Sequence, residues 1–252
     1  MNAVLEQILA TETVTDGTVT LPLRDPIHPL GLVHIDAAEG KLLGDIISAV
    51  DPVATLEIGM AYGVSTLYLC DALSSLGHPV THIVLDPFQS MQWRGIGLMN
   101  VRAAGYGPMI EFHEERSEFE LPRLVASGRS IDFAFVDGWH TFDQVLVDFY
   151  YLDRLLRPGG VIAFDDADWR SVNRVIRYAM SYPNYEVYQA GGSPPVSLLG
   201  RLRRTIGRVP GAERFLRRDL LHRDWDLGIL GSCVALRKTR EEPRSSRWYR
   251  DF

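Results

Sequence analysis

Three aspartates and one histidine stand where this sequence has the greatest potential for chemistry. Asp137 ends one β-branched apolar run, Asp165 and Asp166 end the next, and His140 comes three residues after Asp137. Carboxylates held close together raise one another's pKa unless a cation neutralises them, and oxygen ligands suit Mg²⁺. Histidine titrates near neutral pH and can accept a proton. The pattern predicts a magnesium site at Asp137, Asp165 and Asp166, with His140 or an aspartate as general base.

Each of these residues also has a structural alternative. Aspartates often cap the helix that follows them, and a lone histidine is more often structural than catalytic. Both alternatives stay open on the sequence alone.

A second group of residues suggests a nucleoside ligand. In Glu57–Ser65, Gly59 and Gly63 permit a sharp turn between a strand and a helix and close approach of a ligand to the backbone. Asp86 ends the next strand, where a carboxylate can accept hydrogen bonds from both ribose hydroxyls; its alternative role is a helix N-cap. Ala61 stands where a dinucleotide-binding loop would have its second glycine, so a ligand without a pyrophosphate is favoured.

These residues are positioned by an alternation of short apolar runs and longer helical patterns, which is typical of βαβ units. The fold class predicted is α/β, a Rossmann-like doubly wound, mostly parallel seven-stranded sheet with an antiparallel edge strand. Its helices are expected at 39–50, 66–76, 96–104, 121–126, 141–156 and 171–180. Its strands are expected at 54–58, 81–85, 110–113, 131–136, 161–164, 185–189 and 232–236. Because ligands of such sheets bind at the carboxyl ends of the strands, Gly59, Asp86, Asp137 and Asp165 should line one crevice.

Composition places the chain among globular proteins. It has 252 residues, 46% of them hydrophobic, and a net charge of −6. With no apolar run long enough for a membrane span and no leader pattern, we expect a cytoplasmic protein that binds no membrane. Cys70 and Cys233 are far apart and form no metal or redox motif, so buried free thiols are expected.

The charge is divided unevenly between the body and the tail. Residues 1–200 carry a net charge of −13, whereas residues 201–252 carry +7. A basic tail can meet nucleic acid, but this one has no interleaved aromatic residues and the acidic body would repel a polyanion, so no nucleic-acid partner is expected. Trp248 and Tyr249 pack either on the body or on a second copy, which leaves a homodimer open.

Four ordered motifs resemble those of a known family. They are Thr55–Thr66, Val84–Gln89, Asp132–His140 and Leu155–Asp166. Together they are similar to class I S-adenosylmethionine-dependent methyltransferases, and more narrowly to catechol-type and bacterial sugar and macrolide O-methyltransferases. The resemblance covers residues 35–190.

The resemblance implies roles for particular residues. Those that would bind the cofactor are Glu57, Gly59, Gly63, Ser65, Asp86, Ser117, Glu118, Asp137 and Trp139. Within this set, Gly59, Gly63 and Ser65 would hold the methionine end, Asp86 the ribose, and Ser117 with Glu118 would sit beside the adenine. Asp137, Asp165 and Asp166 match metal ligands, although catechol-type relatives have Asn at the last position, and His140 replaces their catalytic lysine.

The resemblance also implies an activity. The sulfonium methyl group is electrophilic, so the protein must align a hydroxyl oxygen with it and remove the proton. Mg²⁺ bound to the acceptor oxygen would lower the pKa of the hydroxyl, and chelation predicts vicinal hydroxyls, as in a sugar or a catechol-like natural product.

The domain interpretation is a single methyltransferase domain over 1–252. It divides into an N-terminal segment and helix at 1–50, a cofactor-binding core at 51–189, a basic insertion at 190–228 and a last strand and tail at 229–252. The insertion is interpreted as a lid hinged at residues 191–195, with helices at 198–206 and 212–221, or as a solvated surface.

Three alternatives accompany this prediction. One is a metal-independent O- or N-methyltransferase with His140 as base. Another is a binding module that keeps the fold without chemistry. A nicotinamide-dependent oxidoreductase is the most distant, because the glycine pattern is missing.

Overall fold

The computed structural model describes residues 1–24, 34–191 and 224–243. Most of them form a seven-stranded sheet in the order β5-β4-β3-β6-β7-β9-β8. The strands are β3 (Ala54–Ile58), β4 (Thr81–Leu85), β5 (Ile110–His113), β6 (Ile131–Val136), β7 (Leu156–Phe164), β8 (Tyr185–Ala190) and β9 (Val234–Lys238). The first five are parallel, and β9 lies antiparallel between β7 and the edge strand β8. The predicted mostly parallel sheet with antiparallel pairing at one edge is confirmed.

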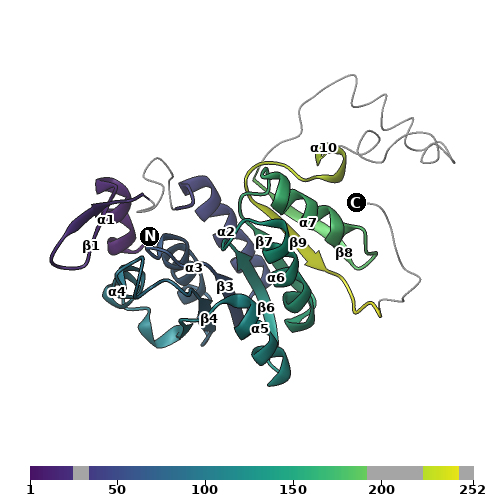
Figure 1. Ribbon diagram of the computed structural model, residues 1–252, viewed down its shortest axis with the longest axis horizontal. Helices are drawn as coiled ribbons and strands as arrows, with labels where there is room; N and C mark the ends of the chain where they lie inside the picture. The colour runs from purple at the N-terminus through teal and green to yellow at the C-terminus, as the bar shows by residue number, and fades with distance from the viewer. Residues whose placement is uncertain (25–33, 192–223, 244–252) are drawn as a thin grey trace.

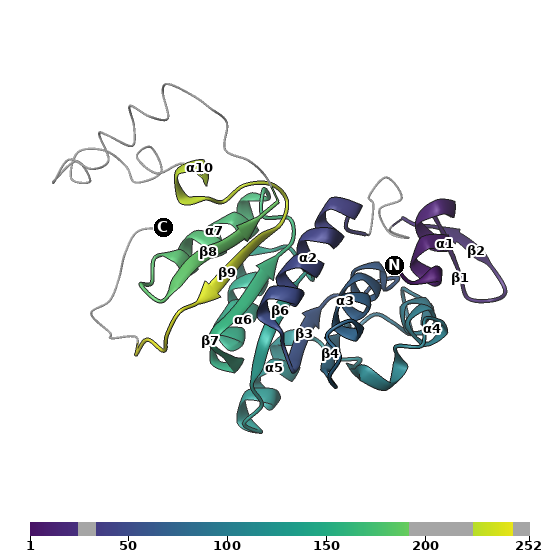
Figure 2. The same ribbon diagram turned by 180° about the vertical axis from the view of Figure 1, so that it is seen from behind.

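Helices cover both faces of the sheet. One face carries α5 (Ser117–Ala126), α6 (Phe142–Leu155) and α7 (Arg170–Met180), as Figure 1 shows. The other carries α2 (Ala37–Val50) and α3 (Val64–Ser74), which lie toward the viewer in Figure 2. Central strands buried on both faces read as continuous apolar runs, which explains why β3 and β6 were predictable from sequence.

A smaller unit packs at the N-terminal end. It contains α1 (Ala3–Thr11) and the hairpin of β1 (Thr13–Thr15) and β2 (Thr20–Pro22), beside α4 (Ile96–Ala103). Leu5, Ile8 and Val14 join the apolar cluster that includes residues of α3 and α4. The sequence analysis named no elements here, because a three-residue hairpin strand is too short for a periodic signal.

Several predicted boundaries differ from the structure, mostly by one or two residues. Helix α5 begins at Ser117 and continues through Pro122. Strand β7 begins at Leu156, because the segment predicted as a Pro-Gly-Gly stop forms an irregular stretch of the strand, where the β6–β7 register shifts. The last strand begins at Val234.

The remaining described elements are short, η1 (Gly107–Met109) and α10 (Asp224–Leu227). The predicted helices at 198–206 and 212–221, most of the predicted hinge, and the tail containing Trp248 and Tyr249 lie outside the described residues. Within the described ranges, no helix is long and apolar enough to cross a membrane. Cys70 and Cys233 are buried free thiols.

Candidate active site

Four parallel strands deliver the predicted chemical residues to one edge of the sheet. The backbone N–H groups of Gly59, Asp137 and Asp165 donate to the last residue of a neighbouring strand at 2.9, 2.9 and 3.0 Å. The N–H group of Asp86 donates to the last residue of β5 at 3.2 Å. These four residues therefore leave the sheet side by side at its carboxyl edge, where ligands of such folds bind.

The loop between β3 and α3 depends on its glycines. Gly59 and Gly63 have φ angles of 90° and 83°. A Cβ on Gly59 would overlap the backbone oxygen of Asp137, so the loop packs directly on the end of β6. Gly63 precedes α3 without a side-chain cap, which leaves the first N–H groups of this helix open to a ligand.

Two of the predicted cofactor-binding side chains, Glu57 and Ser65, bind each other instead of facing outward. The Ser65 hydroxyl donates to Glu57 Oε1 at 2.5 Å, and His82 Nε2 lies 3.1 Å from Glu57 Oε2. His82 Nδ1 lies 2.8 Å from the Thr55 hydroxyl. Thr55, Glu57 and His82 are fully buried, and Ser65 is 6% exposed. This network joins β3, β4 and the first turn of α3 beneath the glycine loop, so it sets the position of that loop.

Asp86 is held from several sides. Its Oδ2 accepts from the N–H groups of Met60 and Ala61 at 3.0 and 2.8 Å and from Gln89 Nε2 at 3.1 Å, and its Oδ1 accepts from the Phe88 N–H at 2.8 Å. Three of these donors reach Oδ2 and only one reaches Oδ1, so Oδ1 keeps an acceptor position for a further donor. Asp86 caps no helix, because the next one begins at Ile96. Its contact with a ribose stays a prediction.

The residues predicted to lie beside an adenine, Ser117 and Glu118, form the first turn of α5. Gln144 Nε2 of α6 donates to Ser117 Oγ at 3.0 Å and to Glu118 Oε2 at 3.2 Å. Below them Asp148 is fully buried, and its Oδ2 has no hydrogen-bond partner. Burial raises the pKa of Asp148 to about 7, against the opposing hydrogen bonds of Ser117 and Gln144.

The three aspartates gather around His140. Its Nε2 lies 3.4 Å from Asp137 Oδ1 and its Nδ1 lies 3.3 Å from Asp166 Oδ2. Asp165 is joined to this group because its Oδ1 accepts from the N–H of Asp166 at 2.7 Å. The Ser171 hydroxyl donates to the backbone oxygen of His140 at 2.6 Å and fixes the loop. The structure thus brings together every residue predicted for catalysis or metal binding.

Glu39 is a fourth carboxylate at this edge, and the sequence analysis missed it. It lies in the first turn of α2 with only 8% of its surface exposed. Asp165 and the Cys233 thiol are among the groups that act on its carboxyl group. Nothing in its local sequence distinguishes it from the acidic residues that commonly occupy a first helical turn.

The electrostatics of this group follow from burial and like charge. Burial and the charge of Asp165 raise the pKa of both Glu39 and Asp137 well above their usual range. Burial disfavours the imidazolium form of His140, but the hydrogen bond to Asp137 and the charges of Asp137, Asp166 and Asp165 outweigh it and raise its pKa. Strongly shifted carboxylates in a cluster are typical of a binding or catalytic site.

The carboxylate oxygens have the right chemistry for Mg²⁺, but their arrangement does not fit the ion. Within residues 1–24, 34–191 and 224–243, no three His, Cys, Asp or Glu side chains converge closely enough to hold a metal. The His140 ring lies between Asp137 and Asp166, where an ion bound to both would have to lie. The Mg²⁺ requirement therefore stays a prediction.

Two exposed tryptophans flank this group. Trp139, predicted to lie beside the cofactor, is 62% exposed, and its ring lies 6.1 Å from that of Phe88. Trp169, which the sequence analysis did not single out, is 54% exposed and lies 5.3 Å from the His140 ring. Exposed indole rings beside buried acids are suited to binding a flat or ring-shaped ligand.

Comparison with known proteins finds similarity to methyltransferases. Residues 56–167 match a family described as a methyltransferase domain. Caffeoyl-CoA O-methyltransferase 2 of Zea mays is 34% identical over 145 residues, which are 56% of this chain and 52% of that protein. Caffeoyl-CoA O-methyltransferase of Stellaria longipes is 30% identical over 149 residues, covering 56% and 57%. The chain thus spans little more than half the length of these relatives.

Solved structures share the fold. The O-methyltransferase TomG of Streptomyces achromogenes, in complex with S-adenosylmethionine, has a TM-score of 0.54 at 23% identity and covers 62% of this chain and 73% of its own. An O-methyltransferase of Bacillus cereus, in complex with S-adenosylhomocysteine, has a TM-score of 0.58 at 19% identity, with coverage of 74% and 83%. These likenesses support the Rossmann-like assignment of the sheet.

Proposed function

We propose that the chain is a class I S-adenosylmethionine-dependent O-methyltransferase and that it transfers the methyl group of S-adenosylmethionine to a hydroxyl of a small acceptor. The observation that carries this proposal is the convergence of the glycine loop and the Asp137, His140, Asp165 and Asp166 group at the carboxyl ends of β3, β6 and β7. This convergence supports a cofactor site beside a proton acceptor.

Features of the chain fit a cofactor with a charged amino-acid end. The uncapped N-terminus of α3 can bind a carboxylate, because its N–H groups are open and the helix dipole favours negative charge. Gly59 lets the backbone turn tightly beside Asp137. Glu39 Oε1 is buried without a hydrogen-bond partner and is available to a ligand.

The chemistry supplied by S-adenosylmethionine is an electrophilic methyl group, so the protein must orient the acceptor and take its proton. His140 is the base that the geometry supports best. Asp137 Oδ1 and Asp166 Oδ2 lie 3.4 and 3.3 Å from its two nitrogens, so a hydrogen bond from one nitrogen to a carboxylate would orient the imidazole and leave the other nitrogen to accept the proton. The neighbouring Trp169 ring offers a surface on which an acceptor can pack. General-base assistance of this kind contributes about 100- to 10,000-fold in rate.

The proposed acceptor is a small diol-containing metabolite of the sugar or catechol type. The plant relatives are named for caffeoyl-CoA, which supports O-methylation as the reaction. We propose no role for Mg²⁺ in the proton transfer, since His140 lies between Asp137 and Asp166.

The test is transfer of a labelled methyl group from S-adenosylmethionine to a panel of catechols and glycosides, each with a mono-hydroxyl counterpart. Activity that survives a chelator supports His140 as the base, whereas activity that needs Mg²⁺ to return supports the metal-chelation mechanism. Glu6→Gln, an exposed change in α1, is the control for His140→Ala. Absence of labelled product with every acceptor, together with no binding of S-adenosylhomocysteine, would contradict the proposal.

A further inference from the structure

Glu39 is the buried acid that the proposed reaction leaves without a role. It belongs to the first turn of α2, where its backbone N–H donates to the side chain of the N-cap residue Asp36 at 2.8 Å. This bond fixes the backbone of Glu39 at the N-terminal end of α2, beside the carboxyl ends of the strands. The side chain is 8% exposed.

The Glu39 carboxyl group lacks a complete set of partners. Its Oε1 is buried and accepts no hydrogen bond from the described residues. A buried acceptor without a partner is unfavourable, so such atoms in folded proteins commonly serve a ligand or store strain. An unpartnered carboxylate oxygen at the edge of a ligand site accordingly indicates a donor that arrives with the ligand.

The neighbours of Glu39 show which donor would suit it. The charged groups that act on it are Asp165 and Asp137, which are both acidic, and the remaining neighbour is the Cys233 thiol. The imidazole of this group is turned to other carboxylates, Asp137 and Asp166. A ligand group that carries positive charge and several N–H donors would relieve the repulsion and satisfy Oε1 together.

The surrounding elements indicate which end of the cofactor meets Glu39. Helix α2 packs along α3, and the residue after Glu39 is Gly40, where a Cβ would come within 2.5 Å of the Tyr68 ring of α3. The two helices therefore approach closely at the level of Glu39. The glycine loop that begins α3 is the expected position of the methionine end, which carries an ammonium group.

From these observations we propose that Glu39 binds the ammonium group at the amino-acid end of the cofactor. This inference rests on the proposed function. A metal ion is the competing cation, but no three His, Cys, Asp or Glu side chains in the described parts of the chain converge to hold one. Glu39 would then be a determinant of cofactor affinity supplied by a helix outside residues 56–167.

The test compares two ligands that differ at this end. Calorimetric titration of wild type and Glu39→Gln uses S-adenosylhomocysteine, which has the amino acid, and 5′-deoxy-5′-methylthioadenosine, which lacks it. Loss of one charge-assisted hydrogen bond should weaken S-adenosylhomocysteine about 10- to 100-fold and leave the other ligand within about twofold. Glu39→Asp, which keeps the charge but shortens its reach, should give an intermediate loss, and Glu6→Gln should change neither affinity.

Several outcomes would overturn the proposal. Equal loss of both ligands would mean that Glu39 acts on the fold, and unchanged affinity for both would mean that it does not meet the cofactor. Weakened Mn²⁺ binding with unchanged nucleoside affinity would assign Glu39 to a metal. Thermal melting of each variant checks folding, and Glu39→Gln should melt no lower than wild type, because burial already favours the uncharged form of Glu39 and the amide is uncharged too. If wild type binds neither nucleoside, both this inference and the proposed function fail.

Discussion

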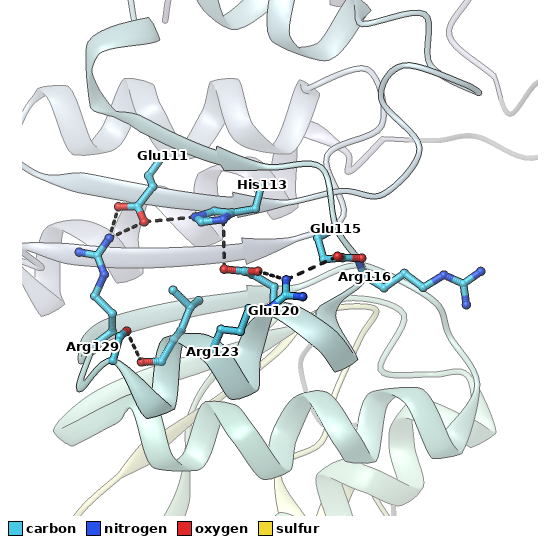
Figure 3. A network of polar contacts seen from close by, with 9 residues as sticks. Glu111, His113, Glu115, Arg116, Glu120, Arg123 and Arg129 are labelled. Carbon is cyan, nitrogen blue, oxygen red and sulfur yellow. Dashed lines mark hydrogen bonds and ion pairs between the residues drawn. The ribbon is translucent and has the colours of Figure 1, made fainter.

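Two groups of charged side chains in this protein are balanced in different ways. The β5–α5 network joins the edge strand β5 to helix α5 (Figure 3) and consists of Glu111, His113, Glu115, Glu120, Arg123 and Arg129. The strand-end cluster lies at the carboxyl ends of β6 and β7 and the start of α2, and consists of Glu39, Asp137, His140, Asp165 and Asp166.

In the β5–α5 network each acid has a basic partner. His113 lies 3.2 Å from Glu111 and 3.1 Å from Glu120, and Arg129 binds Glu111 (Figure 3). Arg123 lies 2.9 Å from Glu120 and 3.5 Å from Glu115. Burial tends to raise the pKa of Glu111, but the hydrogen bonds from Arg129 and His113 outweigh it and lower that pKa. The network is satisfied without a ligand, and it places charges along a sheet edge that would otherwise invite pairing.

The strand-end cluster has four carboxyl groups but only one basic side chain, the imidazole of His140. The pKa values of Glu39 and Asp137 are raised by burial and by Asp165, the opposite direction from Glu111. Charged groups that remain unfavourable in the free protein are what a ligand of opposite charge would stabilise. The number of charged residues in a group therefore does not indicate a ligand site, whereas an excess of carboxyl groups over basic partners does.

The largest expected effect separates the two histidines. His140→Ala should lower kcat about 100- to 10,000-fold, because it removes the proposed base, while binding of S-adenosylhomocysteine is retained. His113→Ala, in the β5–α5 network, should leave kcat unchanged. The measurement is single-turnover methyl transfer at saturating cofactor. Equal losses of kcat in the two variants would contradict a catalytic role that belongs to His140 and not to His113.

Asp148 provides an intermediate case, a single buried carboxyl with incomplete partners. Its pKa is about 7 in the folded protein, above the ordinary 3.8, so the folded state binds the proton more tightly. Stability should therefore be highest below pH 4 with respect to this group and should fall as pH rises toward 7. The Asp148→Asn variant has no carboxyl group to titrate at this position, so it should not lose this part of its stability as the pH rises.

The predicted gain in the free energy of unfolding for Asp148→Asn is about 2 to 4 kcal/mol at pH 8 and near zero at pH 4. Urea unfolding at both pH values measures it. Gln144, which donates to Asp148 Oδ1 at 3.4 Å, can serve an amide oxygen equally well. A gain that did not change with pH would show that the carboxyl group is not protonated in the folded protein.

A smaller effect is a change in the free energy of unfolding, which should differ in sign between the strand-end cluster and the β5–α5 network. Asp165→Asn removes one like charge from the strand-end cluster but keeps an oxygen for the N–H of Asp166, so the free energy of unfolding should rise by about 1 kcal/mol. Glu111→Gln, in the balanced network, should leave stability unchanged or lower it. Chemical denaturation at pH 7.5 compares the two. A loss of stability in Asp165→Asn would contradict the repulsion argument.

The smallest effect concerns salt. Arg129→Ala should lower the free energy of unfolding by less than about 1 kcal/mol, because its pair with Glu111 is largely exposed. About 0.5 M salt should remove most of that loss, because salt screens the attraction between exposed charges. Denaturation curves at two ionic strengths measure this, and a large loss that salt left untouched would mean that Arg129 supports packing rather than charge balance.

The sequence predicted the sheet well for a physical reason. Strands β3, β4, β5 and β6 are apolar runs bounded by turn residues, and their predicted ranges agree with the structure. The strand-end positions follow from topology, which is why Asp86 and Asp137 could be placed at one edge.

Other features needed the three-dimensional arrangement. Glu39 reaches the cluster only because α2 packs near β7, a contact that no local pattern encodes. Glu57 and Ser65, which the resemblance assigns to the cofactor, are hydrogen-bonded directly to each other, and Glu57 also contacts His82, which comes from another strand. Similarly, Pro158 and its following glycines signal a turn locally but lie in an irregular stretch of β7 beside β6.

We propose that the strand-end cluster contributes Glu39 to the cofactor site, whereas the β5–α5 network contributes nothing to it. Titration of wild type, Arg129→Ala and Glu39→Gln with S-adenosylhomocysteine tests it most directly. We expect wild type and Arg129→Ala to bind with equal affinity and Glu39→Gln to bind about 10- to 100-fold more weakly. No binding to wild type, or a loss in Arg129→Ala as large as that in Glu39→Gln, would contradict the claim.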